Sequence, residues 1–327
     1  MFNLAKPFFL QVITPMHVGS GSDLGIIDLP IQRERHTGFP KIESSGLKGC
    51  IREAFENSAM KGIKNGDRKN IIDEVFGPED AGNDAHAGAL GFTDARILLF
   101  PVKSMKGVYA LVTCLSVITK FIEEVSLCKI NYNRSSSPNK EQVSENIDFN
   151  LIEKTVSDDT HLLVNNKVIL EEYMFESKKD ENTQKFAKWL AEKTGIDEIK
   201  QKLVILPDDD FRDFVTISTE VNTRTKINPE TGTVQTGALF TEEFLPAQTV
   251  LYSLALATKV FKKNGVDKFI DKYYKANDNA LDKLEEEKII MKFFTDNLPG
   301  HLQIGGDATL GKGIVKTKIM EVNNNVK

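Results

Sequence analysis

The chain has 327 residues, 40% of them hydrophobic and 27% charged, which is typical of a globular protein rather than a disordered or fibrous one. No stretch approaches the roughly 20 apolar residues that a membrane-spanning helix needs. The formal net charge of −5 argues against bulk attraction to nucleic acid, so any RNA contact must use local basic patches. Three cysteines without a CxxC pair argue against a disulfide framework or a zinc cluster.

The first predicted elements are a strand, a long loop and a helix. Residues 8–18 form an apolar run that we interpret as a buried strand rather than a signal peptide, which predicts a cytoplasmic protein. Residues 46–57 carry apolar side chains at helical spacing. The intervening residues 19–43 show no helical period, and loops of that length in compact domains are usually functional or disordered.

Two basic residues, Lys48 and Arg52, lie four residues apart on the outer side of this predicted helix. Either Ser44 or Ser45 could cap the helix. The free N–H groups of a helix N-terminus favour anions, so this end could hold a phosphate.

The middle of the chain predicts two further strands, an insertion and a hairpin. The strands cover 88–102 and 107–118, and residues 120–210 are more polar and irregular, which indicates an insertion. Residues 216–243 alternate on both sides of the turn sequence "NPETG", which predicts a β-hairpin. Its strands carry little apolar surface, so the hairpin should project from the body.

The last third repeats the order of the first. A strand at 244–257, a helix at 283–297, a strand at 301–306 and a closing strand follow one another. Strand, helix, strand, strand thus occurs twice without a glycine-rich dinucleotide turn. This pattern favours an α+β, ferredoxin-like sheet over a Rossmann fold.

Asp28 lies inside an apolar stretch of the long loop and has two interpretations. An aspartate two residues before Pro30 commonly forms a side-chain turn. Alternatively, the apolar neighbours Ile26, Ile27, Leu29 and Ile31 would partly desolvate the carboxylate and raise its basicity, making a metal ion or a proton a natural partner. Arg33 and Arg35 follow and could bind phosphate, although basic loop residues are more often merely solvated.

A glycine-rich segment, "GGDATLGKG", covers residues 305–313 and includes Gly305, Gly306, Lys312 and Gly313. Its glycines would let backbone N–H groups turn toward an anion, while Lys312 adds a charge. The segment lacks Walker spacing, and no Ser or Thr follows Lys312, so an ATP site is disfavoured. A tight loop between two strands is the simpler explanation of the glycines.

Two further candidates lie far apart in the sequence. His17 ends the first predicted strand, and a lone histidine is more often a packing residue than a catalyst. Glu242 and Glu243 come at the end of the predicted hairpin, and paired carboxylates near a third can bind a divalent cation, although solvent-facing acids are the simpler explanation.

Four strings carry a family resemblance: "TPMHVGSGSDLGIIDLPIQRERHTGFPKIESSGLKG", "FPVKSMKGVYALVTC", "TGALFTEEFLP" and "LQIGGDATLGKGIV". In this order they resemble the RAMP-superfamily backbone subunit, the fourth subunit, of the type III-B CRISPR (Cmr) effector complex. "IDLPIQRE" and "TGFPKI" are specific, and the polar middle contributes little.

The resemblance implies a single RAMP domain over 1–327, with an RRM-like core whose copies stack along guide CRISPR RNA beside other Cmr subunits. Residues 19–43 would be the catalytic loop, and a thumb-like hairpin would displace nucleotides of target RNA, which is then cut in a reaction dependent on Mg²⁺ or Mn²⁺. The essential family aspartate falls on Asp28, the histidine on His17 and the glutamate on Glu242. The family often has tyrosine where this chain has Phe244.

Guide contacts would then come from Arg33 and Arg35, from the first helix with Lys48 and Arg52, and from the glycine segment. The implied function is an antiviral endoribonuclease that makes a 2′,3′-cyclic phosphate and a 5′-OH. A non-catalytic, structural RNA-binding subunit, in which Asp28 only forms a turn, remains the competing interpretation. A lone guide-processing endonuclease and a metabolic enzyme that binds a small phosphate ligand are less supported, the former because no catalytic histidine cluster is present.

Overall fold

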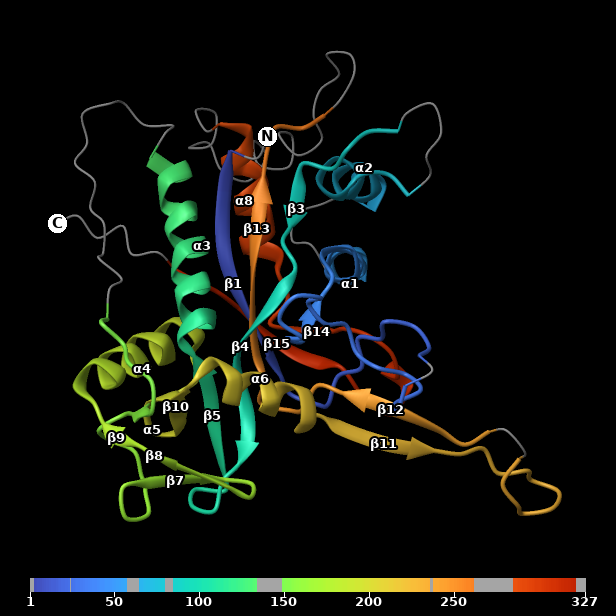
Figure 1. Ribbon diagram of the computed structural model, residues 1–327. Helices are drawn as coiled ribbons and strands as arrows, with labels where there is room; N and C mark the ends of the chain where they lie inside the picture. The colour runs from blue at the N-terminus through green and yellow to red at the C-terminus, as the bar shows by residue number, and fades with distance from the viewer. Residues whose placement is uncertain are drawn as a thin grey trace.

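The computed structural model describes residues 3–23, 25–57, 65–79, 85–133, 149–235, 238–261 and 285–321. Within these ranges, eleven strands form one sheet whose main path runs β14-β15-β1-β13-β4-β5-β10-β6-β9 (Figure 1). Its strands are β1 (Leu4–Val12), β2 (Lys41–Ile42), β3 (Leu90–Phe92), β4 (Ala95–Lys103), β5 (Tyr109–Cys114), β6 (Thr155–Val156), β9 (Lys178–Lys179), β10 (Leu203–Leu206), β13 (Val250–Ala257), β14 (His301–Gln303) and β15 (Ile314–Ile319).

Two smaller ribbons and seven helices complete the described part of the chain. The ribbons are β7 (Lys167–Leu170) with β8 (Tyr173–Glu176), and β11 (Glu220–Arg224) with β12 (Phe240–Phe244). The helices are α1 (Ser44–Asn57), α2 (Asn65–Phe76), α3 (Leu115–Asn133), α4 (Glu181–Thr194), α5 (Ile199–Lys202), α6 (Asp208–Ile217) and α8 (Glu286–Asn297).

The centre of the sheet has the ferredoxin-like order β15-β1-β13-β4. β1 is antiparallel to both β13 and β15, with α1 following β1 and α8 following β13. This is the duplicated strand-helix-strand arrangement that the sequence pattern predicted. The predicted α+β, ferredoxin-like class is confirmed.

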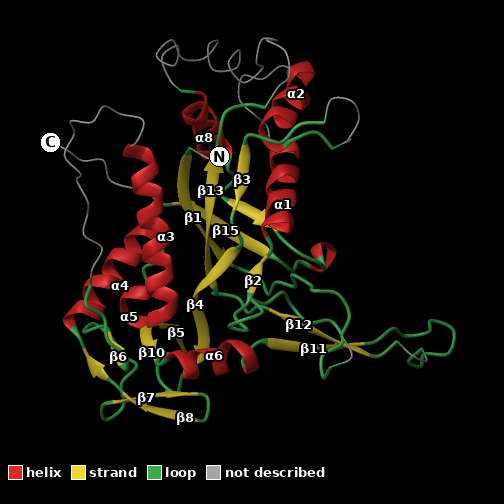
Figure 2. Cartoon of the chain, turned by 45° about the horizontal axis from the view of Figure 1, so that its top comes forward, coloured by secondary structure: helices red, strands yellow, loops and turns green. Residues whose placement is uncertain are grey.

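Adjacent phenylalanines of β1 show why both faces of the sheet carry helices. Successive strand side chains point to opposite faces. Phe8 accordingly packs against Phe294 of α8, with ring centroids 5.6 Å apart, whereas Phe9 packs against Phe121 of α3 at 5.9 Å. Helices on both faces explain why β1 is an apolar run rather than an alternating strand. Figure 2 shows the yellow strands between α3 on one side and α1 on the other.

Several predicted boundaries differ from the structure. The first strand is Leu4–Val12 rather than 8–18, and the apolar run at 107–118 is divided between β5 and the beginning of α3. The predicted insertion, 120–210, begins inside α3 and contains β10, which pairs in parallel with β5 in the main sheet. Residues 134–148 of that range lie outside the described residues. The segment is therefore integrated into the sheet at its last strand.

The ribbon of β11 and β12 extends away from the body at the lower right of Figure 1. Its five registered pairs run from Glu220 with Phe244 to Arg224 with Phe240, and a bridge joins Ile227 to Val234 near the "NPETG" turn. The predicted start of the hairpin at residue 216 is therefore too early, because α6 continues to Ile217 and β11 begins at Glu220.

No helix in the described ranges is both long and apolar enough to cross a bilayer.

Candidate active site

The long loop lies alongside β12 and is fixed to it by backbone pairing. Leu29 forms a parallel bridge with Glu242, because its N–H donates to the Thr241 carbonyl at 3.0 Å and its carbonyl accepts from Glu243 N–H at 3.0 Å. Residues near Asp28 therefore form an extended segment beside the hairpin. This pairing determines where Asp28 of the loop and Glu242 and Glu243 of β12 lie.

Asp28 is exposed, and the hydrogen bonds that its carboxylate accepts within the described residues come from Thr241. The Oδ2 atom of Asp28 accepts from the Thr241 backbone N–H at 2.7 Å and from its hydroxyl at 2.8 Å. The Thr241 Oγ1 atom in turn accepts the Asp28 backbone N–H at 2.9 Å. The backbone N–H of Thr241, and secondly its hydroxyl, hold the pKa of Asp28 below its ordinary value.

The expectation that apolar neighbours raise the basicity of Asp28 is therefore wrong. Ile26 is 99% exposed, so it removes little water from the carboxylate. Hydrogen bonds to the ionised form outweigh the small desolvation, and the carboxylate stays charged. The chemistry available at Asp28 is that of an accessible anion rather than of a strong base.

His17 and Glu242 form a buried pair on the other side of β12. The Nδ1 atom of His17 lies 2.7 Å from the Glu243 carbonyl oxygen, and its Nε2 atom lies 3.6 Å from Glu242 Oε1. Only 6% of the Glu242 side chain is exposed. Burial raises the pKa of Glu242, while the neighbouring charges of His17 and then Arg224 act to lower it.

Arg224 of β11 joins this pair to the glycine-rich segment. Its Nε atom lies 2.9 Å from Glu242 Oε2, and its two terminal nitrogens contact the Asp307 carboxylate at 2.9 and 2.5 Å. Paired contacts of this kind fix both distance and orientation. Neither Asp307 nor Thr241 was identified from the sequence. Hydrogen bonds across 83 and 213 residues, respectively, leave no local pattern to read.

Glu242 and Glu243 point to opposite faces of β12, because neighbouring strand residues alternate. Glu243 accepts from the Ile31 backbone N–H at 3.0 Å, from Arg33 Nη2 at 2.5 Å and from the Thr219 hydroxyl at 2.8 Å. The pair therefore does not form the two-carboxylate cation site that was considered for "TEE".

Arg33 is a structural residue in this arrangement. Besides Glu243, its guanidinium donates to the carbonyl oxygens of Gly38 and Val215, each at 2.9 Å. These contacts leave it poorly placed to bind phosphate, contrary to the expectation from the sequence. Arg35, two residues later, is exposed, and no ion pair is found for it within the described residues.

The glycines of residues 305–313 allow close contact with the end of the first strand. Gly305 has a φ of +86°, and a Cβ there would lie 2.1 Å from the His17 carbonyl oxygen. Gly306 N–H donates to that oxygen at 2.8 Å, and Gly313 N–H donates to the Pro15 carbonyl at 3.0 Å. These two N–H groups therefore bind carbonyl oxygens of the protein. The prediction that backbone N–H groups of this segment bind an anion is thus wrong for Gly306 and Gly313. Gly305 and Gly306 remain on the surface.

Phe244 lies beneath the basic residues of this cluster. Its ring is fully buried, with Lys312 Nζ 4.8 Å and the Arg224 guanidinium carbon 5.6 Å from the centroid. The His17 ring approaches it edge-on at 5.7 Å. A ring in this position serves as a packing and cation–π platform.

The first helix abuts the glycine-rich segment. The backbone of Gly305 hydrogen-bonds the Cys50 thiol, although burial dominates and raises the pKa of that thiol. Ser44 N–H donates to Asp94 Oδ1 at 2.9 Å, and Ser44 is the first residue of the helix, so neither Ser44 nor Ser45 precedes it as a cap. The Asp94 carboxylate thus already occupies part of the end expected to hold phosphate.

Lys48 and Arg52 differ in how many other residues their side chains bind. Arg52 contacts Glu56 at 2.7 Å, Asp73 at 3.1 Å and the Gly77 carbonyl, so its role is structural and the predicted RNA contact is not supported. Lys48 has no ion pair within the described ranges. Burial, followed by the nearby charge of Arg52, lowers the pKa of Lys48.

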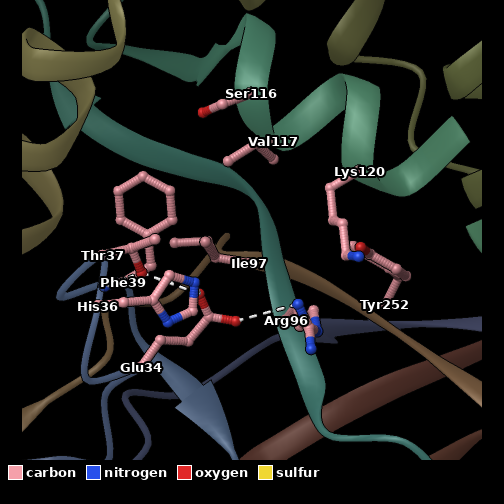
Figure 3. A pocket seen from close by; sticks show the side chains of 10 residues that line it. All are labelled: Glu34, His36, Thr37, Phe39, Arg96, Ile97, Ser116, Val117, Lys120 and Tyr252. Atoms are coloured by element: carbon pink, nitrogen blue, oxygen red, sulfur yellow. Dashed lines mark hydrogen bonds and ion pairs between the residues drawn. The ribbon is translucent and has the colours of Figure 1, made fainter. Parts of the chain in front are cut away.

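A hollow of about 460 Å³ lies between α3 and β4. Figure 3 shows Glu34 directed at Arg96, 3.3 Å away, with Lys120 and Tyr252 across the opening. Asp28, His17 and Glu242 do not line it. The hollow is therefore separate from the residues that contact the hairpin.

The fold and the site define the class of protein. The family model of the RAMP superfamily matches residues 9–316, and the chain belongs to that superfamily. Within it, the chain is 39% identical to the CRISPR system Cmr endoribonuclease Cmr4 of Pyrococcus furiosus, over 97% of this chain and 96% of that protein.

Solved structures agree with this assignment. The crystal structure of oligomeric Cmr4 from Pyrococcus furiosus has a TM-score of 0.66 and 30% identity, covering 98% of this chain and 100% of that one. A chain of the type III-B Cmr-beta complex in its apo state has a TM-score of 0.67 at 23% identity, covering 99% of each chain, and supports the fold alone. The predicted membership of the RAMP superfamily, as a relative of the Cmr backbone subunit, is confirmed.

Proposed function

We propose that this chain is a backbone subunit of a type III-B CRISPR effector complex that binds guide RNA and cuts complementary target RNA at regular intervals. The observation that carries the proposal is Asp28, an exposed, ionised carboxylate fixed to the projecting hairpin. The 39% identity to a Cmr endoribonuclease supports the reaction class, and the similarity to an oligomeric Cmr4 supports a filament of like subunits. The function would be antiviral defence in the cytoplasm, beside other Cmr subunits.

The reaction best suited to this site is internal transfer within the target RNA. Displacing one nucleotide breaks A-form geometry and can align its 2′-oxygen with the adjacent phosphorus. The 2′-hydroxyl gives its proton to water and its oxygen bonds to phosphorus, while the bond from phosphorus to the 5′-oxygen breaks and that oxygen takes up a proton from water. The products are a 2′,3′-cyclic phosphate and a 5′-OH. The hairpin at 216–243 is the proposed thumb within a single RAMP domain, and residues 19–43 form the catalytic loop.

The lowered pKa of Asp28 assigns it an electrostatic role. A carboxylate with a depressed pKa is a weak general base but a good ligand for a cation. Within the described residues, no cluster of three His, Cys, Asp or Glu side chains could hold a metal ion alone. Mg²⁺ is commonly bound by one or two carboxylates together with substrate phosphates and water, and Asp28 fits that donor set. A bound Mg²⁺ or Mn²⁺ would neutralise charge at the reacting phosphate.

His17 and Glu242 complete the proposed catalytic group. They lie on the opposite side of β12 from Asp28 and are linked to each other and to Arg224. Phe244 is fully buried beneath them, so the proposal requires no hydroxyl at the position where the family often has tyrosine.

The proposed RNA surface is smaller than the sequence suggested. We retain Arg35, Lys48 and Lys312, together with the exposed backbone at Gly305 and Gly306, because Cys50 places α1 against the glycine-rich segment. Gly313 is buried and serves packing. Since the proposed RNA surface holds few cations per subunit, an isolated chain should bind RNA weakly and without guide selectivity.

Reconstitution with guide RNA and the other subunits tests the proposal. Asp28→Ala is expected to leave target binding intact and to lower cutting by at least about 100-fold. Unchanged cutting by this variant would instead favour the purely structural subunit. Replacing Mg²⁺ or Mn²⁺ by a chelator is expected to stop cutting while the complex stays assembled.

A further inference from the structure

We propose that Thr241 is a positioning residue for Asp28, which fixes one oxygen of that carboxylate and leaves the other for the substrate. The inference rests on the proposed function of Asp28 and adds a residue that acts through it. Two donors from Thr241, the backbone N–H at 2.7 Å and the hydroxyl at 2.8 Å, converge on Oδ2. No hydrogen bond to Oδ1 is found among the described residues, so this oxygen remains available.

The contact is reciprocal, which makes its geometry specific. The Thr241 hydroxyl gives its only hydrogen to Asp28 Oδ2 and accepts the Asp28 backbone N–H at 2.9 Å. Side chain and backbone of Asp28 are therefore held by the same oxygen. An exposed aspartate without these contacts would sample several rotamers, and the catalytic geometry would be lost for part of the time.

Thr241 also connects the carboxylate to the hairpin. It lies in β12 and pairs across the hairpin with Thr223 of β11. The strand that carries the proposed thumb is thus the same strand that orients Asp28. When the hairpin contacts the displaced nucleotide, it would therefore also position the Asp28 carboxylate. The nucleotide and the carboxylate would then keep a fixed relative position.

Other charged groups do not replace this contact. The acids nearest to Asp28 along the two paired segments are Asp23 on the loop and Glu242 and Glu243 on β12. Glu242 faces His17 and Arg224, and Glu243 faces Arg33. The two hydrogen bonds that the Asp28 carboxylate accepts within the described residues both come from Thr241.

The test uses the reconstituted complex and three variants, with kcat and KM for cutting measured separately. Thr241→Val removes the hydroxyl at nearly constant volume, and Thr241→Ser restores it. Thr295→Val is the control, because it removes a hydroxyl that donates to the Lys292 carbonyl within α8, away from the hairpin. Thr241→Val is expected to lower kcat about tenfold and to leave KM for target RNA unchanged, because the carboxylate is misplaced while the RNA contacts remain. Thr241→Ser and Thr295→Val are expected to keep the wild-type kcat.

A wild-type kcat in Thr241→Val, or equal losses in Thr241→Val and Thr241→Ser, would overturn the inference. Should Thr241→Val fail to assemble, Thr241→Ala in the same assay decides the matter: a wild-type kcat refutes the positioning role, and a loss that Thr241→Ser does not share supports it. Asp28→Ala is run alongside. If it cuts normally, the proposed function itself fails. If it is inactive while Thr241→Val is normal, only the positioning role is wrong.

Discussion

The Nδ1 atom of His17 lies 2.7 Å from the carbonyl oxygen of Glu243. A carbonyl can only accept, so Nδ1 carries the proton and Nε2 is turned toward Glu242, 3.6 Å away. One residue of β12 thereby sets the orientation of the ring through its backbone, and its neighbour faces the other nitrogen. The two functions of the imidazole can be separated by substitution.

His17→Asn is expected to keep the fold and lose cutting. The Asn amide nitrogen can replace Nδ1 as donor to the Glu243 carbonyl, but nothing replaces Nε2. Its free energy of unfolding should therefore stay within about 1 kcal/mol of the wild type, whereas His17→Ala should lose about 1–3 kcal/mol, because the buried acceptor is left unpaired. Denaturant unfolding and cutting assays measure both. Normal cutting by His17→Asn would contradict a catalytic role for Nε2.

The pH dependence of stability should reveal the raised pKa of Glu242. Burial raises this pKa in the folded state, so the folded chain binds that proton more tightly than the unfolded chain. The resulting stabilisation is present below the unfolded pKa and is lost as the pH rises through the folded pKa. Glu242→Gln cannot titrate, so its Tm relative to wild type should increase from pH 4 to pH 7. A constant or decreasing difference would show that Arg224 and His17 outweigh burial.

Arg33 and Arg35 should separate stability from RNA binding. Arg33→Ala leaves the Glu243 carboxylate, 2% exposed, without its cation and is expected to cost about 3–5 kcal/mol of unfolding free energy. Arg35→Ala, at an exposed position, should change stability by less than about 0.5 kcal/mol and weaken guide binding. Chemical denaturation and binding titrations distinguish them. Equal stabilities of the two variants would contradict the structural role of Arg33.

Lys48 should contribute a phosphate contact. Lys48→Ala is expected to weaken binding of guide RNA in the assembled complex and to reduce the slope of log affinity against log salt by about 1. Lys185→Ala is the matched control, since Lys185 is an exposed helical lysine that pairs with Glu181 at 2.7 Å. A salt slope unchanged by Lys48→Ala, or reduced equally by the control, would remove α1 from the RNA surface.

Gly305 should be intolerant of any side chain. Gly305→Ala places a Cβ 2.1 Å from the His17 carbonyl oxygen at a φ of +86° and is expected to lower stability by at least about 2 kcal/mol. Gly300→Ala is the control, because a Cβ there meets nothing within 4 Å. Thermal unfolding compares them. If the two variants melt together, the close approach of the segment to His17 is not as described.

The pattern of nearby residues was sufficient to predict most of the helices and strands and the location of the long loop. The apolar run of β1, the helical spacing that became Ser44–Asn57 and the turn sequence between β11 and β12 all depend on residues within a few positions of one another. The two-fold repeat of these elements was enough to predict the ferredoxin-like sheet. The same local reasoning placed the ends of elements less well, because helix and strand ends depend on partners elsewhere, such as Asp94 at the start of α1.

The sequence by itself determined that Asp28 lies in a long loop, that a hairpin projects, and which superfamily the chain resembles. Only the tertiary structure distinguished the roles of nearby residues of the same type. Arg33 binds Glu243 whereas Arg35 is exposed, and Glu242 and Glu243 face opposite sides of β12. It also reversed the expected direction of the Asp28 pKa. The physical reason is that charge, burial and hydrogen bonding at each of these residues come from partners up to 226 residues away, which meet only when the loop pairs with β12.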